Sequence, residues 1–146
     1  MKKLTITILS ILLIISCNNQ NEEINIEENE CLVQIADTWT LISLDQIPEY
    51  LDGGLEGFNL KALSEIRYPS QAREDGIEGI AIIEYEITID GNVENINITQ
   101  DPGTGLGNEA KRVLETITEG ISFSPAILNN NPVRVKKEFQ ANFELE

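Results

Sequence analysis

Strict alternation of apolar and polar residues marks the middle of the chain. Between Ile80 and Asp90, one face of an extended chain would carry only apolar side chains: Ala81, Ile83, Tyr85, Ile87 and Ile89. The other face begins with Ile80 and Ile82 and is polar from Glu84 onward. A period of two with one polar face predicts an antiparallel strand that is solvated on one side. Asp90-Gly91-Asn92 then predicts a hairpin turn, and Val93 to Thr99 predicts the returning strand.

The end of the chain repeats this alternation and predicts a third strand, from Val133 to Leu145, whose apolar face is interrupted by Lys137. Three other stretches have helical character: Leu60 to Ile66, Pro69 to Asp75, and about Glu109 to Thr118. Asn108 is the expected N-cap of the last helix. Together these elements predict an α+β domain in which a three-stranded antiparallel sheet packs on two helices.

The first residues have the pattern of a secretory signal. Lys2 and Lys3 precede an apolar run from Leu4 to Ile15, which is too short for a transmembrane helix of about 20 residues. Ile14-Ile15-Ser16-Cys17 looks like a bacterial lipobox, in which Cys17 is acylated and becomes the first mature residue. The alternative is an ordinary signal peptide cut elsewhere, with a free thiol at Cys17.

An acidic segment separates this signal from the predicted domain. Asn18 to Glu30 is rich in Asn and Glu and is too polar to bury a core, so it predicts a flexible tether. Residues 31–44 mix apolar and polar side chains, and they fit either a strand packed on the domain or an unstructured lead-in. The expected organisation is a lipoprotein signal peptide at 1–16, a tether and lead-in at 17–47, and a domain at 48–146. Cys31 has no partner cysteine once Cys17 is lipidated.

Charge and composition exclude several functions. A net charge of −15 argues against binding nucleic acid or anionic lipid, and the absence of histidine removes the commonest general base and metal ligand. Gly103 to Gly107 superficially resembles a nucleotide-binding loop, but it follows a hairpin strand and no Lys-Ser/Thr pair comes after it. Glu84 and Glu86 imitate a catalytic pair, yet alternating acids are typical of a solvated strand face. We expect no enzyme activity, metal or cofactor.

An ordered series of short motifs covers residues 48–145. The motifs are Pro48-Glu49-Tyr50, Gly53-Gly54, Ile66-Arg67-Tyr68-Pro69-Ser70-Gln71-Ala72-Arg73, Gly76-Ile77-Glu78-Gly79, Asp90-Gly91-Asn92-Val93, Phe123-Ser124-Pro125-Ala126 and Asn131-Pro132-Val133. This series resembles the C-terminal domain of TonB energy transducers, in the form common in Bacteroidetes-type bacteria. The residues that carry the family motif most clearly are Tyr68, Pro69, Ala72, Arg73, Gly76 and Gly79.

The resemblance implies a protein partner. In the family, the domain captures an extended segment of an outer-membrane receptor by pairing it with the last strand. This agrees with the long final strand, because an unpaired strand edge accepts an extended peptide. Carried onto this chain, the partner-binding residues are Val133, Val135, Lys137, Phe139, Ala141 and Phe143. For the Tyr68 to Arg73 motif, a structural role in packing is the favoured interpretation.

The N-terminal half departs from an energy transducer, which normally has an inner-membrane helix and a long proline-rich spacer. No proline precedes Pro48, and a tether this short would span only about 20 Å. The sequence therefore predicts a lipid-anchored outer-membrane protein with a periplasmic or surface-exposed domain, which binds receptor or envelope-protein segments in TonB-dependent transport. One alternative is an envelope scaffold that binds cell wall or another lipoprotein, and the other is a full transducer that retains its N-terminal anchor.

Overall fold

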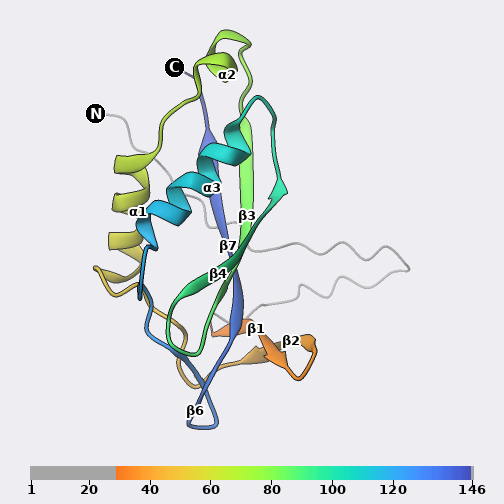
Figure 1. Ribbon diagram of the computed structural model, residues 1–146, viewed down its shortest axis with the longest axis vertical. Helices are drawn as coiled ribbons and strands as arrows, with labels where there is room; N and C mark the ends of the chain where they lie inside the picture. Colours follow the sequence, from red (N-terminus) through yellow and green to blue (C-terminus); the bar gives the residue numbers. More distant parts are fainter. Residues whose placement is uncertain (1–28, 146) are drawn as a thin grey trace, which may run out of the picture.

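The computed structural model describes residues 29–145, which form one sheet, a small strand pair and three helices (Figure 1). The elements in chain order are β1 (Glu30–Ile35), β2 (Thr38–Ser43), α1 (Gly54–Glu65), α2 (Ser70–Glu74), β3 (Gly79–Ile87), β4 (Val93–Gln100), α3 (Leu106–Ile117), β5 (Ala126–Leu128), β6 (Asn131–Val133) and β7 (Val135–Phe143). The main sheet has the order β2-β1-β7-β3-β4, and β5 pairs with β6 separately. The predicted α+β class is confirmed.

The main sheet has five strands, so the prediction of three was too low. The two additional strands, β1 and β2, come from the stretch that was left open between a strand and a lead-in. They form an antiparallel hairpin, which joins the sheet where Leu32 lies opposite Lys136 and Val33 opposite Val135. The local sequence does not indicate these strands clearly, because they are stabilised by pairing with β7. That strand lies about a hundred residues further along the chain. The sheet therefore includes residues ahead of Pro48.

The predicted last strand is divided in two by the structure. Val133 ends β6 and pairs with Ala126 of β5, whereas β7 begins at Val135 and ends at Phe143. Asn129 and Asn130 both have positive φ angles, of 51° and 61°, which is the conformation that a two-residue hairpin turn requires. The asparagines therefore place Val133 in a separate hairpin.

Two of the three helices begin earlier than predicted. α1 begins at Gly54 rather than at Leu60, and α3 begins at Leu106, so Asn108 lies inside α3 and is not its cap. The side chain of Asp101 takes the place of a cap at the N-terminal end of α3. Its Oδ1 accepts hydrogen bonds from the backbone N–H groups of Gly103 and Gly107, each at 2.9 Å. A side chain on residue 107 would meet that carboxylate at 2.7 Å. α2 follows Pro69 as predicted.

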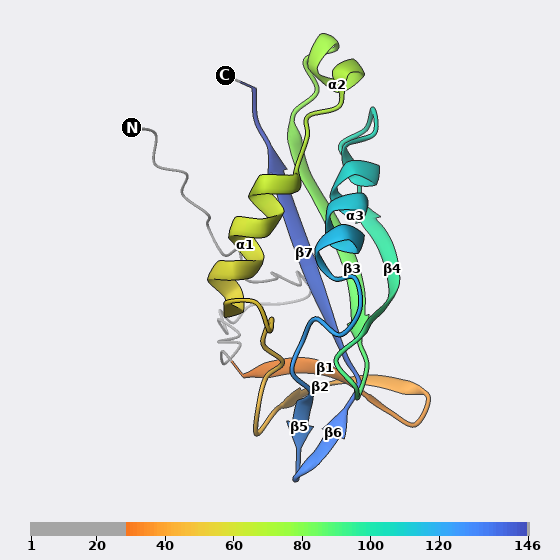
Figure 2. The same cartoon turned by 60° about the vertical axis from the view of Figure 1, so that its left-hand side comes forward.

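The core lies between one face of the sheet and the helices α1 and α3, as Figure 2 shows. Its largest fully buried side chains are Ile83, Ile87, Leu106, Leu114, Val33, Val113 and Val135. An aromatic cluster closes one end of it. Phe58 of α1 packs edge-on against Phe139 of β7 and against Tyr50, with ring centroids 5.7 and 5.4 Å apart. The Tyr50 hydroxyl donates to the backbone oxygen of Ile117 at 2.7 Å.

The predicted hairpin between β3 and β4 is confirmed. Gly91 has a φ of 84° at the turn, and a Cβ there would come within 1.9 Å of the backbone oxygen of Phe123. Thr88 Oγ1 accepts hydrogen bonds from the backbone N–H groups of Asn92 at 3.1 Å and Asp90 at 3.3 Å. Only glycine combines this conformation with so close an approach.

Candidate strand-edge binding site

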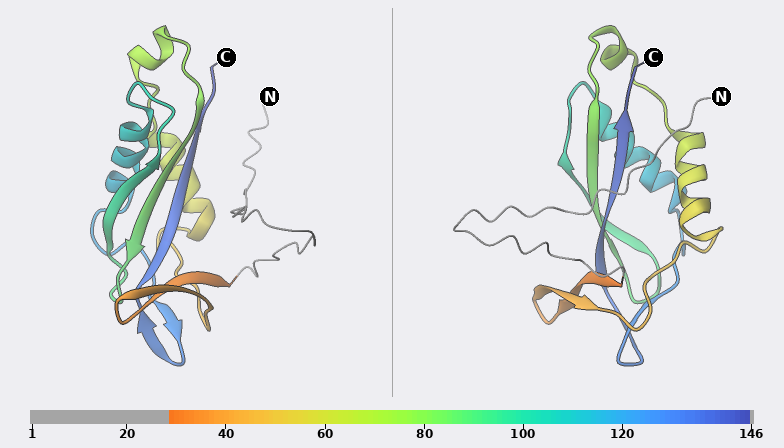
Figure 3. Two further views of the ribbon diagram at one scale, coloured as in Figure 1. Left: turned by 90° about the vertical axis from the view of Figure 1, so that its right-hand side faces the viewer. Right: turned by 180° about the vertical axis from the view of Figure 1, so that it is seen from behind.

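β7 lies inside the sheet order, yet much of one of its edges is free. On one side β3 pairs with it along its whole length, from Gly79 opposite Phe143 to Ile87 opposite Val135. On the other side β1 pairs only at Val135 and Lys136, after which the two strands diverge (Figure 3). Among residues 29–145 no strand pairs with this second edge beyond Lys136. We call the edge from Lys137 to Phe143 the free edge of β7.

The register determines which backbone groups the free edge presents. The N–H of Gln34 donates to the oxygen of Arg134 at 3.0 Å, so Arg134 faces β1. Alternate residues of an antiparallel strand direct both backbone groups to the same side. Glu138, Gln140 and Asn142 therefore present their N–H and C=O groups to the free edge, and the intervening residues bond to β3. An extended segment placed along this edge would find three residues ready to pair.

The predicted partner-binding residues occupy the inner face of this strand. Val135, Phe139, Ala141 and Phe143 are buried against the helices, and Lys137 on the same face is half-buried. Their backbone groups pair with β3, so the groups at the free edge belong to the residues between them. The sequence pattern could not indicate this, because alternation reports side-chain faces and the direction of backbone groups depends on the neighbouring strands. Direct contact of the predicted residues with a partner stays a prediction.

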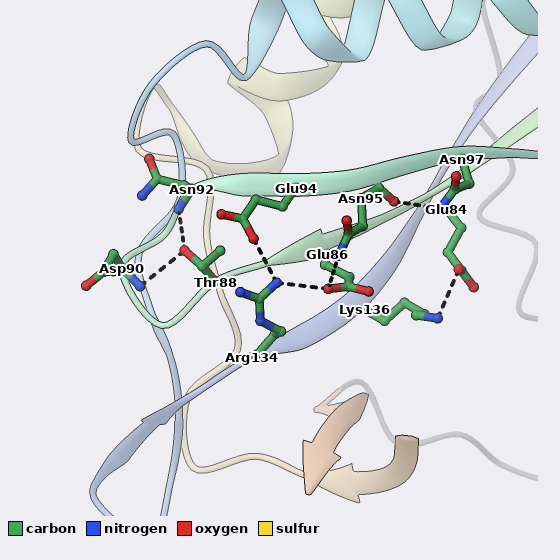
Figure 4. Close-up of polar contacts among 10 residues, drawn as sticks. All are labelled: Glu84, Glu86, Thr88, Asp90, Asn92, Glu94, Asn95, Asn97, Arg134 and Lys136. Atoms are coloured by element: carbon green, nitrogen blue, oxygen red, sulfur yellow. Dashed lines mark hydrogen bonds and ion pairs between the residues drawn. The ribbon is translucent and has the colours of Figure 1, made fainter. Parts of the chain in front are cut away.

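An ion-pair network fixes the sheet near the beginning of β7 (Figure 4). Arg134 Nη1 lies 2.9 Å from Glu86 Oε2 and 2.9 Å from Glu94 Oε2, and so joins β3, β4 and the start of β7. Its pKa is raised, because the hydrogen-bonded carboxylates of Glu86 and then Glu94 stabilise the charged form. Lys136 Nζ lies 3.0 Å from Glu84 Oε1, so each member of the acidic pair on β3 has a basic partner. These acids are therefore partly buried ion-pair partners within the sheet, which supports a structural interpretation of the pair.

Lys136 also connects the N-terminal hairpin to the sheet. Its Nζ lies 4.6 Å from the ring centroid of Trp39 on β2, within the range of a favourable cation–π contact. Together with the pairing of Leu32 and Val33, this contact holds the hairpin at the start of β7. The hairpin therefore limits the free edge at Lys136.

The family motif lies at the opposite end of β7. The ring of Tyr68 packs edge-on against Phe143 at 5.6 Å, its hydroxyl donates to the backbone oxygen of Ile77 at 2.5 Å, and the Arg73 guanidinium lies 5.8 Å from the same ring. Burial, and then the charge of Glu78, raise the pKa of Tyr68. An open hollow of about 510 Å³ is lined by Tyr68, Arg73, Glu144 and Leu145.

The other motif residues have backbone or packing positions. Ala72 is completely buried. Gly76 has a φ of 65° just after α2, and Gly79 begins β3 with a φ of 143°. Pro69 directly precedes α2. These contacts support a structural role for most of the motif.

The two cysteines have different positions. Cys17 lies outside the described residues, so its lipidation stays a prediction. Cys31 on β1 is buried, with 7% of its surface exposed, and this burial raises the pKa of its thiol. Within residues 29–145, no helix is long and apolar enough to cross a membrane, and no group of three or more His, Cys, Asp or Glu side chains has a metal-binding arrangement.

These features define a small α+β domain with an open strand edge. A family model described as Gram-negative bacterial TonB protein C-terminal matches residues 64–145, which is more than half of the chain. The chain therefore belongs to the TonB C-terminal family. Domains of this family are non-enzymatic protein-interaction domains associated with transport in the cell envelope.

Two solved structures are similar to part of the chain. An NMR solution structure of the Helicobacter pylori TonB C-terminal domain, residues 179–285, is 22% identical, with a TM-score of 0.44, and the match covers 66% of this chain and 91% of that one. A second NMR structure of that domain, residues 194–285, is also 22% identical, with a TM-score of 0.46 and coverage of 63% and 96%. No curated protein matches the chain.

Proposed function

We propose that this protein is a lipid-anchored component of the cell envelope. Its TonB C-terminal domain would bind extended segments of outer-membrane receptors, or of other envelope proteins, in TonB-dependent transport. The observation that carries this proposal is the free edge of β7, in a domain whose family binds proteins. Main-chain pairing with such an edge gives affinity for an extended segment of almost any sequence.

The magnitude of main-chain pairing bears on how such a segment binds. Glu138, Gln140 and Asn142 offer two backbone groups each. A typical hydrogen bond contributes a net ~1 kcal/mol, so the edge supplies ~6 kcal/mol. Association itself costs ~4–15 kcal/mol. Backbone pairing alone would therefore bind weakly, and side-chain contacts must add to it.

The anchor in this proposal is Cys17. The residues between Cys17 and β1 are polar and acidic, and a flexible tether of this length would span roughly 20 Å. The domain would then stay close to the membrane that carries the lipid. We therefore propose an accessory role beside the outer membrane rather than coupling across the periplasm.

Metabolic labelling with a clickable fatty acid tests the anchor. We expect the wild-type chain to incorporate the label and the Cys17→Ala variant to lose it. A wild-type chain that never incorporates label would contradict lipid anchoring.

A proline substitution tests pairing at the free edge. Gln140→Pro removes an N–H group that faces outward, so it should leave the ladder to β3 intact, because proline is tolerated on edge positions. We expect the folded Gln140→Pro variant to recover receptors from outer-membrane extract at least about tenfold less well than wild type, a loss of about 1.4 kcal/mol.

Two controls accompany this experiment. Gln140→Ala changes the side chain but keeps the N–H group, so it should recover receptors as wild type does. Phe139→Pro should instead unfold the domain, because that N–H group belongs to the pairing with β3. Equal recovery of the same receptors by wild type and folded Gln140→Pro would show that pairing at this edge is wrong.

A further inference from the structure

We infer that the β1–β2 hairpin docks on the membrane that carries the lipid anchor and places one of its faces against a net-neutral lipid surface. The docking rests on the proposed function, because it needs the anchor at Cys17, and it gives the protein a second contact with the bilayer. The contacting side chains are Leu32 of β1 with Trp39 and Leu41 of β2. We call these three side chains the outer face of the hairpin.

The strand register places these three side chains together. Leu32 lies opposite Leu41, and Trp39 stands two residues before Leu41 on the same strand. Residues opposite each other in an antiparallel pair share a face, as do residues two apart on one strand. The neighbours of Leu32, Cys31 and Val33, are buried in the core. The outer face is therefore directed away from the core.

The outer face remains largely exposed. Helices α1 and α3 pack on the opposite face of the sheet, so among residues 29–145 no helix covers the outer face (Figure 2). Leu32 and Leu41 are 37% and 48% exposed, and Trp39 is half-buried. Lys136 covers part of the Trp39 ring, with its Nζ 4.6 Å from the ring centroid. A tryptophan beside exposed leucines suits the headgroup level of a membrane, where one side of the ring is apolar and the other is wet.

The hairpin is the first described element after the anchor. β1 begins at Glu30, so twelve residues, 18–29, separate it from Cys17. A chain of this length spans at most about 45 Å when fully extended. In Figures 2 and 3, the hairpin lies across the beginning of β7, at the end of the molecule opposite α2. The chain therefore enters the domain at the hairpin, and the lipid holds the outer face within this distance of the bilayer.

Such a tether makes a small contact sufficient. Once the lipid is inserted, contact of the outer face with the same bilayer is an intramolecular event. Its effective concentration is then on the order of millimolar for a short linker. Three apolar side chains that would bind free vesicles weakly are therefore enough to hold the hairpin at the surface.

The charges around the outer face select the kind of lipid. β2 carries no charged side chain, although the whole chain has a net charge of −15. The other side chains on this face of the hairpin are Glu30, Gln34 and Ser43, of which only the first is charged. The neighbouring base is Lys136, whose Nζ lies 3.0 Å from Glu84 Oε1. Because this base is already paired, the face offers little attraction to anionic lipid and fits a net-neutral surface.

Trp39 is the only tryptophan of the chain, so its fluorescence reports on the outer face alone. The probes are phosphatidylcholine vesicles that carry the full lipidated chain and have either ordinary or brominated acyl chains. Bromine quenches a tryptophan only where the ring contacts the lipid. We expect brominated vesicles to reduce Trp39 emission at least about twofold. Equal emission from both kinds of vesicle would overturn the inference.

Aspartate substitutions locate the contact on the hairpin. Leu41→Asp places a charge in the outer face, so it should remove at least about half of the quenching by brominated lipid. Leu60→Asp is the matched control, because Leu60 is 61% exposed and lies on α1. Its quenching should equal that of wild type. Wild-type quenching that Leu41→Asp leaves intact, or that both variants reduce equally, would overturn the role of the outer face. The comparison of vesicles with the wild-type chain decides the inference even where a variant does not fold.

Other occupants of the outer face would give different results. The outer edge of β2 has no partner strand within residues 29–145, so a second copy of the chain is the competing occupant. Dimers that Leu41→Asp abolishes, together with equal emission in both kinds of vesicle, would assign the face to that copy and overturn the inference. Quenching that requires added anionic lipid would overturn the assignment of a net-neutral surface.

The outcomes also distinguish the docking from the proposed function. A chain that incorporates the fatty-acid label but shows no quenching keeps the proposed anchor and loses the docking. A chain that never incorporates the label contradicts both, because the docking needs the anchor. Receptor recovery by wild type and Gln140→Pro is decided separately, because the free edge of β7 lies beyond Lys136.

Discussion

Glu109 joins two helices that are far apart in the sequence. Its Oε1 accepts hydrogen bonds from the backbone N–H of Arg67 and from Arg112 Nη2, both at 2.8 Å, and its Oε2 accepts from Arg112 Nε at 2.9 Å. Arg112 Nη2 also donates to the backbone oxygen of Glu65 at 2.7 Å. The end of α1 is thereby tied to α3.

Replacement of the Glu109 carboxylate should lower the stability of the fold by an amount that depends on pH. The hydrogen bonds from Arg112 lower the pKa of Glu109 below its ordinary value of 4.5. A carboxylate whose folded pKa is depressed stabilises the fold above its unfolded pKa, and this contribution disappears as the pH falls through the folded value. We expect Glu109→Gln to lower the free energy of unfolding by about 1–2 kcal/mol at neutral pH. The deficit should shrink on acidification below about pH 4.5.

Chemical denaturation at several pH values measures this deficit. Glu115→Gln on the same helix is the control, because Glu115 is half-exposed and lies 3.9 Å from Lys111, a pair of small expected energy. A Glu109→Gln deficit that is constant from neutral to acidic pH would contradict the assignment.

At the scale of elements, the β1–β2 hairpin determines how much of β7 is available. Its pairing covers Val135 and Lys136 and leaves the remainder of that edge free. Local sequence could not predict the hairpin, because the apolar residues of 31–44 alternate only in part and their burial depends on a distant strand. In contrast, β3 and β4 could be predicted, since alternation and the Asp90-Gly91-Asn92 turn are local signals. The cap of α3 was missed because it comes from Asp101, outside the usual N-cap position.

Truncation of Val33 tests whether the hairpin is part of the cooperative fold. Val33 is completely buried in the core and lies opposite Val135 of β7, so Val33→Ala should lower the free energy of unfolding by about 2 kcal/mol. Ile35→Ala is the control on the same strand. Ile35 is 48% exposed, and its truncation should change stability by less than about 0.5 kcal/mol. Equal small effects of both substitutions in urea denaturation would mean that β1 is not part of the cooperative unit.

At the scale of the whole molecule, the sequence predicted the fold class and the family. It did not predict which backbone groups the free edge of β7 presents. Side-chain alternation identified Phe139 and Ala141, whereas the register with β1 and β3 leaves Glu138, Gln140 and Asn142 with outward backbone groups.

Amide hydrogen exchange along β7 tests the central claim most directly. In the free chain, the amides of Lys137, Phe139 and Ala141 should exchange slowly because they pair with β3, and those of Glu138, Gln140 and Asn142 should exchange fast. Addition of a receptor segment recovered with the wild-type chain should slow these three fast amides selectively. Protection of all six amides in the free chain, or fast exchange that the bound segment does not change, would contradict the account.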